Sequence, residues 1–463
     1  MSLPKPILLA ASLTCLWLYA CNSDDNSGGD DDYVPLVIET APDNGEVMAN
    51  QTLDVAIFAN DTNIPTDGEL SLSNPQQGVV EVLDNNTPNN VSDDQVRYTP
   101  NLTANGADSF QYTICDLSGE GCQTETVSIN VFPVSPVNYD LEAMPYATLS
   151  EYNFFDGLMV DQNPVYGVLP YAPITPLFSD YAAKRRFIWM PDGSQANYVS
   201  DHELINMPVG TILIKTFSYN DVQPSGGEMI LETRVMIKKQ TEWAFANYLW
   251  NETQDEADYS LDGAFKEVSW LQNGVEKNIN YRIPSQSECF TCHKSVDVNI
   301  PIGVRAQNLN SNYDFSDGTQ NQLQKWVEMG YLEDNLPGTI NTVVDYTDAS
   351  QSLDLRVRSY LDINCANCHS DGGHCDYRPL RLAFNESGDP NNIGICVDPD
   401  TPVVGFEDAR VVDPGNIENS ILHFRMSTVA EEYRMPLIGR KLQHEEGVAL
   451  IEEWINSLDQ NCN

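Results

Sequence analysis

Two five-residue segments in the second half of the chain share the pattern Cys-x-x-Cys-His. They are Cys289-Phe290-Thr291-Cys292-His293 and Cys365-Ala366-Asn367-Cys368-His369. Two thiols at this spacing can form thioether bonds to the two vinyl groups of one porphyrin, and the histidine that follows can ligate the porphyrin iron. A structural zinc site would need further ligands, and none lies near either motif at a regular spacing. The motifs therefore predict two covalently bound haem c groups. The predicted attachment residues are Cys289, Cys292, Cys365 and Cys368, and the predicted ligands of haem iron are His293 and His369.

A methionine downstream of the second motif is the expected sixth ligand of the second haem iron. Met435 lies in the segment Arg434-Met435-Pro436, and a thioether on a proline-stiffened loop suits an electron-transfer haem, whose reduction potential it raises. Met426 is the rival. It lies in a run with a helical pattern over residues 420–426, where packing is the usual role of a methionine.

The sequence leaves the sixth ligand of the first haem iron open. Met329 is the one methionine in the interval that follows His293, beside the end of a helix expected over residues 320–329. An iron without a strong protein ligand would instead leave a site for peroxide or another small molecule. The remaining alternatives are His202, His423 and His444.

Two amphipathic segments flank the second motif. The first begins near Asp348, and the second closes the chain. Apolar residues at helical spacing lie at Leu353, Val357, Tyr360 and Leu361 in the first, and at Val448, Ile451, Ile455 and Leu458 in the second. In class I cytochrome c folds two such helices cross and shield the haem. The C-terminal part is therefore expected to be a mainly α, cytochrome c-like di-haem module.

The composition describes a large and strongly acidic globular protein. The chain has 463 residues, of which 41% are apolar and 9% aromatic, enough to bury several cores. It carries 68 acidic residues against 24 Lys and Arg, a formal net charge of −44. Such a surface repels nucleic acid and anionic lipid, so neither is an expected partner. A solvated acidic surface suits a salty or extracytoplasmic environment.

The N-terminal segment predicts export and lipid anchoring. Lys5 precedes an apolar run over residues 7–20 that is too short to span a bilayer as a permanent helix. The run ends in Leu18-Tyr19-Ala20-Cys21, which resembles a bacterial lipobox and implies cleavage before Cys21 and lipidation of its thiol. The next residues are Ser, Gly, Asn and Asp, as in a flexible tether. We expect attachment to a membrane of the bacterial cell envelope through the lipid alone, on the periplasmic or the cell-surface face.

Two β-rich stretches precede the haem motifs. Over residues 34–133, short β-type runs alternate with Gly, Asn, Asp and Pro clusters. The segments Ala59-Asn60-Asp61 and Asp108-Ser109-Phe110-Gln111-Tyr112 resemble bacterial Ig-like, cadherin-like domains, which implies a β-sandwich. Cys115 and Cys122 flank a turn in this stretch and predict a disulfide in an exported protein. The second stretch reads as an antiparallel β-rich domain, without a nucleophile–base constellation.

The expected parts of the whole chain are a signal peptide (1–20), a tether (21–33), an Ig-like domain (34–133), a β-rich domain (140–283), a first haem segment (284–345) and a cytochrome c-like domain (346–463).

A series of short motifs after residue 149 carries a family resemblance. They include Thr175-Pro176-Leu177-Phe178-Ser179-Asp180-Tyr181, Glu232-Thr233-Arg234, Arg305-Ala306-Gln307-Asn308-Leu309-Asn310 and Tyr360-Leu361-Asp362-Ile363-Asn364-Cys365. On these motifs, residues 149–463 resemble a family of uncharacterised bacterial di-haem cytochrome-c-like proteins. The segment Gly373-His374-Cys375 departs from the family pattern. Two disulfide pairings then stay open, Cys375 with Cys396 or Cys396 with Cys462.

Three classes of function are consistent with the sequence. The first is transfer of single electrons between redox partner proteins of the cell envelope. The second is a haem enzyme, peroxidase- or oxidase-like, in which the first haem is open to a small-molecule ligand. The third is a surface adhesion or scaffold lipoprotein. The electron carrier is the main expectation, because a covalently attached haem stays with an exported protein and the Met435 loop suits an electron-transfer iron.

Overall fold

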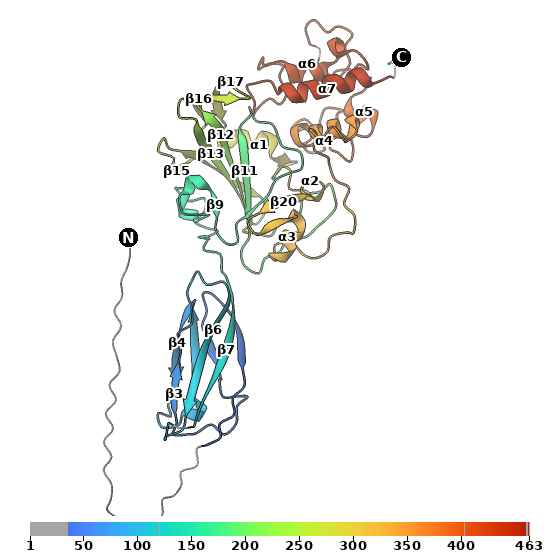
Figure 1. Cartoon of the computed structure of the whole chain (residues 1–463). Helices are drawn as coiled ribbons and strands as arrows, with labels where there is room; N and C mark the ends of the chain where they lie inside the picture. The colour runs from blue at the N-terminus through green and yellow to red at the C-terminus, as the bar shows by residue number, and fades with distance from the viewer. Residues whose placement is uncertain (1–35, 120, 402, 460–461, 463) are drawn as a thin grey trace, which may run out of the picture. The chain divides into compact units, whose positions relative to one another are not determined.

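The computed structural model describes residues 36–119, 121–401, 403–459 and 462 (Figure 1). It divides into two compact units, residues 1–133 and 134–463. The expected signal peptide, the lipidation site Cys21 and most of the tether lie outside the described residues and stay predictions. Within the described part of the chain, no helix is long and apolar enough to cross a membrane.

The first unit is an all-β domain with two sheets. One sheet has the strand order β1-β7-β6-β3 and the other the order β2-β5-β4. Every second residue of β6 is buried over much of its length, as expected for a strand with one face in a core. The strands are β1 (Asp43–Met48), β2 (Leu53–Val55), β3 (Glu69–Leu72), β4 (Gly78–Leu83), β5 (Gln95–Pro100), β6 (Gly106–Cys115) and β7 (Cys122–Phe132).

The second unit is built on an antiparallel sheet. Its main path runs β10-β11-β12-β13-β14-β15, and β16 pairs with both β12 and β17. Further two-stranded pieces lie outside this sheet. The bounds are β8 (Phe155–Asp156), β9 (Asn163–Pro164), β10 (Leu169–Pro170), β11 (Ala183–Trp189), β12 (Ile212–Val222), β13 (Gly227–Lys238), β14 (Trp243–Trp250), β15 (Ala257–Ser260), β16 (Ala264–Gln272) and β17 (Val275–Ile283).

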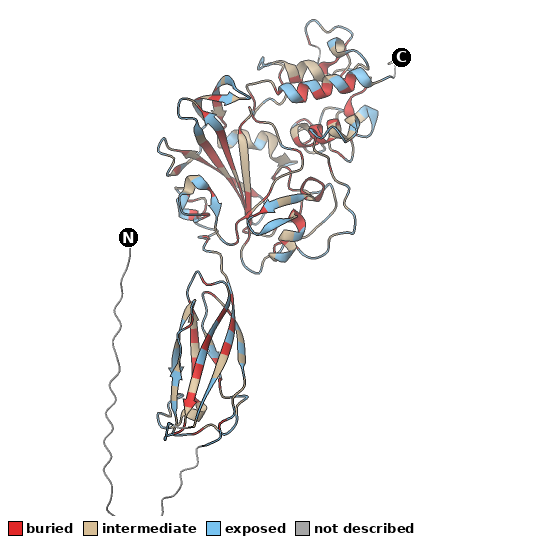
Figure 2. Ribbon diagram, in the orientation of Figure 1, coloured by how far each residue is buried: buried red, intermediate tan, exposed pale blue. Residues whose placement is uncertain are grey.

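Both faces of this sheet are covered, so its central strands are buried almost without interruption (Figure 2). One face packs against the segment that precedes β11, through residues such as Ile214 and Val235. The other face carries Leu213 and Met236, which pack against Trp326 and its neighbours. The segment with the first motif is therefore docked on the sheet and shares its core.

The expectation of a mainly α cytochrome c-like C-terminal module is wrong. The described chain is mostly β, and only α4 and α7 among its described helices reach 13 residues. The physical reason is the sequence between these two helices, where Gly, Pro, Asp and Asn interrupt the apolar periodicity and produce turns. The helices are α1 (Gln286–Cys292), α2 (Ala306–Leu309), α3 (Gln322–Glu328), α4 (Leu353–Cys365), α5 (Pro390–Ile393), α6 (Ile421–Ser427) and α7 (Glu445–Ser457). Short strands β18 (Lys294–Ser295), β19 (Val298–Asn299), β20 (Asn312–Phe315) and β21 (Gly318–Asn321) lie between α1 and α3.

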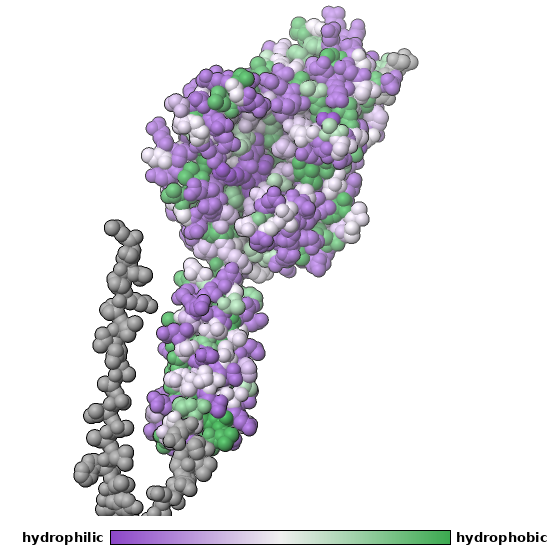
Figure 3. Space-filling view, viewed as in Figure 1, coloured by the Kyte–Doolittle hydropathy of each residue, from purple (hydrophilic) through white to green (hydrophobic). Residues whose placement is uncertain are grey.

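The two amphipathic helices expected around the second motif are present as α4 and α7. They pack together in one core, in which Leu361 of α4 and Ile451 and Trp454 of α7 are buried. Hydrophilic side chains cover most of the visible face of this unit (Figure 3).

Two disulfides are formed among the described cysteines. Cys115–Cys122 joins facing residues at the end of the β6–β7 hairpin and confirms the predicted bridge. The second is Cys396–Cys462, with a Cα–Cα distance of 5.2 Å. The alternative pairing of Cys375 with Cys396 is therefore wrong, because Cys375 is a buried free thiol whose backbone N–H donates to the carbonyl of Cys368 at 2.9 Å.

Candidate functional site

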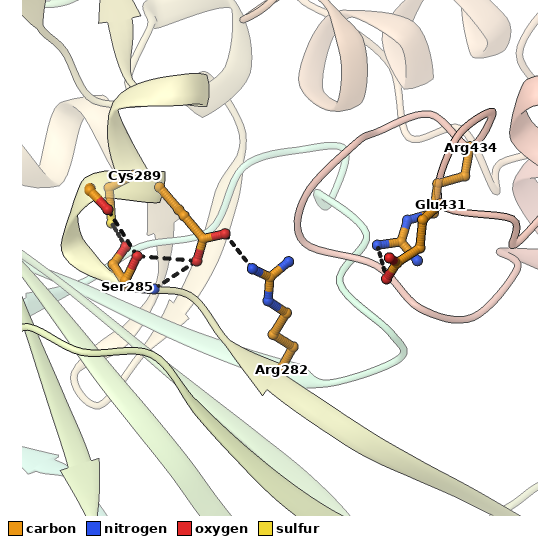
Figure 4. Close-up of polar contacts among 7 residues, drawn as sticks. Arg282, Ser285, Cys289, Glu431 and Arg434 are labelled. Atoms are coloured by element: carbon orange, nitrogen blue, oxygen red, sulfur yellow. Dashed lines mark hydrogen bonds and ion pairs between the residues drawn. The ribbon is translucent and has the colours of Figure 1, made fainter.

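The first Cys-x-x-Cys-His motif lies at the end of a capped helix. Helix α1 begins after Ser285, whose N–H donates to the Glu288 carboxylate at 3.0 Å in a capping box. Glu288 is also ion-paired with Arg282, so one carboxylate fixes the start of the helix (Figure 4). Three residues apart on α1, Cys289 and Cys292 lie on one side of the helix.

The second motif closes α4 with the same turn. The N–H of His369 donates to the carbonyl of Cys365 at 3.0 Å, and the N–H of His293 donates to the carbonyl of Cys289 at 3.0 Å. Helix α4 begins after Ser352, whose hydroxyl accepts from the N–H of Leu355. In both motifs the histidine is therefore held one helical turn beyond the first cysteine.

Removing the helix cap should test how the first motif is positioned. Ser285→Ala is expected to lower the free energy of unfolding by about 1 kcal/mol, because it removes the capping-box hydroxyl that donates to the Glu288 carboxylate at 3.2 Å. Urea unfolding followed by circular dichroism measures the loss. Ser287→Ala, two residues further along, is the control. Its hydroxyl contacts the Ser285 hydroxyl at 3.1 Å but not Glu288, so its loss should cost less, and equal losses would contradict a specific capping role.

The two motifs, far apart in sequence, meet in space. The Cys368 thiol donates to the carbonyl of Thr291 at 3.8 Å, and Cys368 and Cys292 line the same two cavities. The proximity of the two thiols lowers the pKa of Cys292 and raises that of Cys368. Just beyond the motifs, the N–H of Val296 donates to the carbonyl of Gly372 at 2.7 Å. The backbone of one motif therefore positions the other.

A large cavity of about 370 Å³ opens beside the second motif, within the size range of ligand pockets. Cys365, Cys368 and His369 line it together with both candidate methionines, Met426 and Met435. The structure thus brings the predicted attachment residues, the predicted iron ligand and the predicted sixth ligand to one cavity. We call this the large cavity.

The His369 side chain has the properties of a metal ligand without its metal. Its Nδ1 atom is buried and has no hydrogen-bond partner in the described structure. Burial lowers the pKa of His369 to about 4, helped by nearby arginines such as Arg378. The imidazole is therefore neutral at pH 7, the form in which histidine binds a metal.

The loop with Met435 is held by a buried arginine. Arg440 donates from Nε to the carbonyl of Met435 at 3.0 Å, and from Nη2 to the carbonyls of Arg425 and Thr428 at 2.9 and 2.8 Å. Arg434, the residue before Met435, pairs with Glu431 at 3.4 Å (Figure 4). These contacts hold the backbone of the loop that carries Met435.

A small cavity of about 170 Å³ adjoins the first motif, and Cys289, Cys292 and His293 line it. His293 Nδ1 lies 3.0 Å from the carbonyl oxygen of Ile300. Because a carbonyl only accepts, Nδ1 carries the proton and Nε2 keeps its lone pair, the tautomer found in metal-ligating histidines. Burial lowers the pKa of His293 to about 3. Cys292 and Cys368 line both cavities, which are therefore contiguous.

The expected alternatives for the first iron are not brought to the small cavity. Among the described residues that line it, none is Met329, His202, His423 or His444. Met329 packs beside the core around Trp326. The lining does include Met236 of β13. The sequence did not single out this residue, because a methionine within an apolar strand has no pattern that separates a ligand from a core residue.

His444 lies beside the large cavity in a cluster of aromatic residues that the sequence did not reveal. Its ring stacks on Phe178 with centroids 4.1 Å apart, and its two nitrogens are hydrogen-bonded to Tyr360 at 2.9 Å and Tyr346 at 3.3 Å. Burial lowers the pKa of His444 to about 4. The imidazole therefore belongs to the wall of the cavity rather than to the first motif.

The His444 cluster predicts a loss of stability in acid. The pKa of His444 is lower in the folded state, about 4, than its ordinary value of 6.5, so protons favour the unfolded state. The full stability of the folded state is therefore present above about pH 6.5. As the pH falls towards 4, the free energy of unfolding drops by about 3 kcal/mol in all on account of His444. Urea unfolding at pH 7 and pH 4.5 measures the change. His444→Gln should reduce the pH dependence, and an unchanged dependence would contradict this origin.

Within the described residues, no group of three or more His, Cys, Asp or Glu side chains is arranged to hold a bare metal ion. The residues of the two motifs instead offer one neutral histidine beside two free thiols at each cavity. This donor set fits an iron porphyrin, which needs one imidazole on the iron and two thiols at its edge.

Comparison with known proteins identifies the first unit. Residues 32–130 match the family model described as bacterial Ig domain. No curated protein matches the chain. Among solved structures, the endo-fucoidan hydrolase MfFcnA4 of glycoside hydrolase family 107 matches with a TM-score of 0.17 and 10% sequence identity. The match covers 45% of this chain and 27% of the hydrolase chain. A chimeric titin Z1Z2 has a TM-score of 0.16 and 10% identity over 46% of this chain and 96% of that chain. Residues 32–130 of this protein are thus a bacterial Ig domain.

Proposed function

We propose that this chain is an exported, lipid-anchored di-haem c-type cytochrome that transfers single electrons between redox partner proteins of the cell envelope. The observation that carries the proposal is the meeting of the two Cys-x-x-Cys-His motifs at Cys292 and Cys368, with His293 and His369 lining one cavity each. Two Cys-x-x-Cys motifs in contact can also form a four-cysteine zinc site. Among the described residues, however, no three His, Cys, Asp or Glu side chains are arranged to hold a bare metal ion. The two disulfides found elsewhere leave all four motif thiols free.

The chain's own residues supply the binding and the protection that such a function requires. When bound, a haem c supplies a one-electron iron couple. Cys289 and Cys292 on one side, and Cys365 and Cys368 on the other, would hold the two groups covalently. Burial keeps the imidazoles of His293 and His369 neutral and limits the access of water.

Contact between the motifs gives the two sites a short route for electrons. The N–H of Val296, just beyond the first motif, donates to the carbonyl of Gly372, just beyond the second, at 2.7 Å, and this backbone contact does not depend on the motif thiols. The Met435 loop adds a ligand that raises the potential of the second site. The second site is therefore the expected electron acceptor of the pair, and the bacterial Ig domain serves as a spacer from the membrane.

A haem enzyme is the second candidate, and one observation favours it. None of the expected ligands Met329, His202, His423 and His444 is among the described residues that line the small cavity. The first iron would then have a position open to a small molecule, unless Met236 supplies the sixth ligand.

Electron paramagnetic resonance of the oxidised holoprotein, with and without azide, tests the proposal. An electron carrier predicts two low-spin signals that azide does not change. A high-spin signal that azide removes would contradict the carrier and support the enzyme. Met236→Leu, recorded in the same way, should create that signal if Met236 is the sixth ligand, whereas Met329→Leu is the matched control and should not.

A further inference from the structure

A row of basic side chains crosses the sheet beside the first motif. Arg186 on β11 lies directly opposite Lys215 on β12, and Lys215 lies opposite Arg234 on β13. Asn247 on β14 continues the row. Neighbouring strands are about 4.8 Å apart, so three cationic side chains stand side by side on one face of the sheet.

The next row on the same face shows what the sheet would otherwise carry there. This next row lies two residues away on each strand, and because the strands are antiparallel the residue numbers rise on one strand and fall on the next. Its facing residues are all apolar and belong to one core: Ile188, Leu213, Met236 and Phe245. The chain has only 24 Lys and Arg against 68 acidic residues. Like charges in directly opposite positions destabilise a sheet, so this cationic row needs a compensating partner.

Only one member of the row has such a partner in the structure. The Arg234 guanidinium donates to both oxygens of the Glu232 carboxylate, at 2.8 and 2.6 Å. Among the described residues, no carboxylate forms an ion pair or hydrogen bond with Arg186 or Lys215. The Lys215 ammonium lies 4.9 Å from the centroid of the Phe217 ring, and burial together with the neighbouring cations lowers its pKa well below the ordinary value.

The unmatched cations line the small cavity of the first motif. Arg186, Lys215 and Arg234 share this lining with Cys289, Cys292 and His293. The Asn247 amide also lines it, and both its nitrogen and its oxygen are buried without a hydrogen-bond partner. The lining also includes Glu288, whose carboxylate is paired with Arg282. Among the described residues, two cations of the cavity therefore lack a carboxylate partner and one amide lacks a hydrogen-bond partner, beside thiols and an imidazole suited to an iron porphyrin.

We infer that Arg186 and Lys215 bind the two propionate carboxylates of the haem attached at Cys289 and Cys292. The inference rests on the proposed function and deepens it, because it assigns the opposite edge of the first haem to the cationic row. Two cations without partners match two carboxylates in number and sign. A guanidinium can bind a carboxylate through two parallel hydrogen bonds, and the Asn247 amide can donate a further one. A free oxyanion has the same chemistry and is the competing source of negative charge.

The test is the pH dependence of the reduction potential of the first haem, measured on the holoprotein between about pH 5 and pH 8. Propionates paired with two cations stay ionised throughout this range, so the wild-type potential is expected to be independent of pH. Arg186→Gln and Lys215→Gln should each introduce a pH-dependent step, because a propionate without its cation is protonated within the range. A wild-type potential that already depends on pH would overturn the inference without any variant.

Arg185→Gln is the matched control. Arg185 is the neighbour of Arg186 on β11, and its guanidinium pairs with Glu228 at 2.6 Å, away from the small cavity. Its loss removes the same charge and should leave the potential independent of pH. Lys215→Arg keeps the charge and should also keep the flat profile. Flat profiles in Arg186→Gln and Lys215→Gln would overturn the inference.

Two further measurements separate this inference from its alternatives. Mass spectrometry of each sample shows whether the first motif carries a haem, and a bare motif in the wild type would overturn the proposed function itself. Sodium acetate is then added to the wild-type holoprotein. A saturable change in the absorption spectrum that Arg186→Gln abolishes would assign the cations to a free oxyanion and overturn the propionate assignment. No change is the expected result.

Discussion

Met435→Ala is expected to remove the methionine–iron absorption band of the second haem and to lower its reduction potential by on the order of 100 mV. The thioether favours the reduced iron, and its loss leaves water or a weaker ligand in that position. Met435 lies in the wall of the large cavity, on a loop that Arg440 holds through the Met435 carbonyl. Optical spectra and potentiometric titration of the oxidised holoprotein measure both effects.

Met426→Ala is the control for this prediction. Met426 lines the same cavity, but it lies in α6 and is buried in the core that α4 and α7 share. Its loss should lower stability and leave the absorption band in place. A band that survives Met435→Ala and disappears in Met426→Ala would exchange the roles of the two methionines.

Trp454→Ala is expected to lower the free energy of unfolding of the second unit by about 3–5 kcal/mol. The indole is 3% exposed and packs in the core between α7 and α4, the helix whose end carries the second motif. Truncation leaves a cavity in that core, which the neighbouring helix and the disulfide to Cys462 prevent from collapsing fully. Urea unfolding followed by circular dichroism measures the loss.

Glu453→Ala provides the comparison for Trp454. Glu453 is its neighbour on α7 and is exposed, so its replacement should change the free energy of unfolding by less than about 0.5 kcal/mol. If both variants lost the same stability, the packing of α7 on α4 would not be the source of the effect.

Local patterns in the sequence predicted local features of the fold. The apolar spacing before Cys365 and near the end of the chain predicted α4 and α7, because a buried helical face requires that period. The β-type runs of residues 34–133 predicted the Ig-like unit, and the short turn between Cys115 and Cys122 predicted their disulfide. Each of these signals lies within one element or one hairpin.

Features that depend on contacts between distant segments could not be predicted. The meeting of the motifs rests on contacts such as Val296 with Gly372, and nothing in either segment specifies the other. The row from Arg186 to Arg234 appears only when the register of three strands is known. The expectation of a mainly α module was wrong because it extended the pattern of two amphipathic helices to the whole region around them. Most of the residues between these two helices form turns.

The most direct test of the central claim is the mass of the intact protein, produced in a host that attaches haem to Cys-x-x-Cys-His motifs. The wild type should carry two haem groups. Cys289→Ala with Cys292→Ala should carry one, and so should Cys365→Ala with Cys368→Ala. Cys375→Ser should keep both, because Cys375 is a free thiol on the large cavity outside either motif. A wild-type protein without added haem mass would contradict the account.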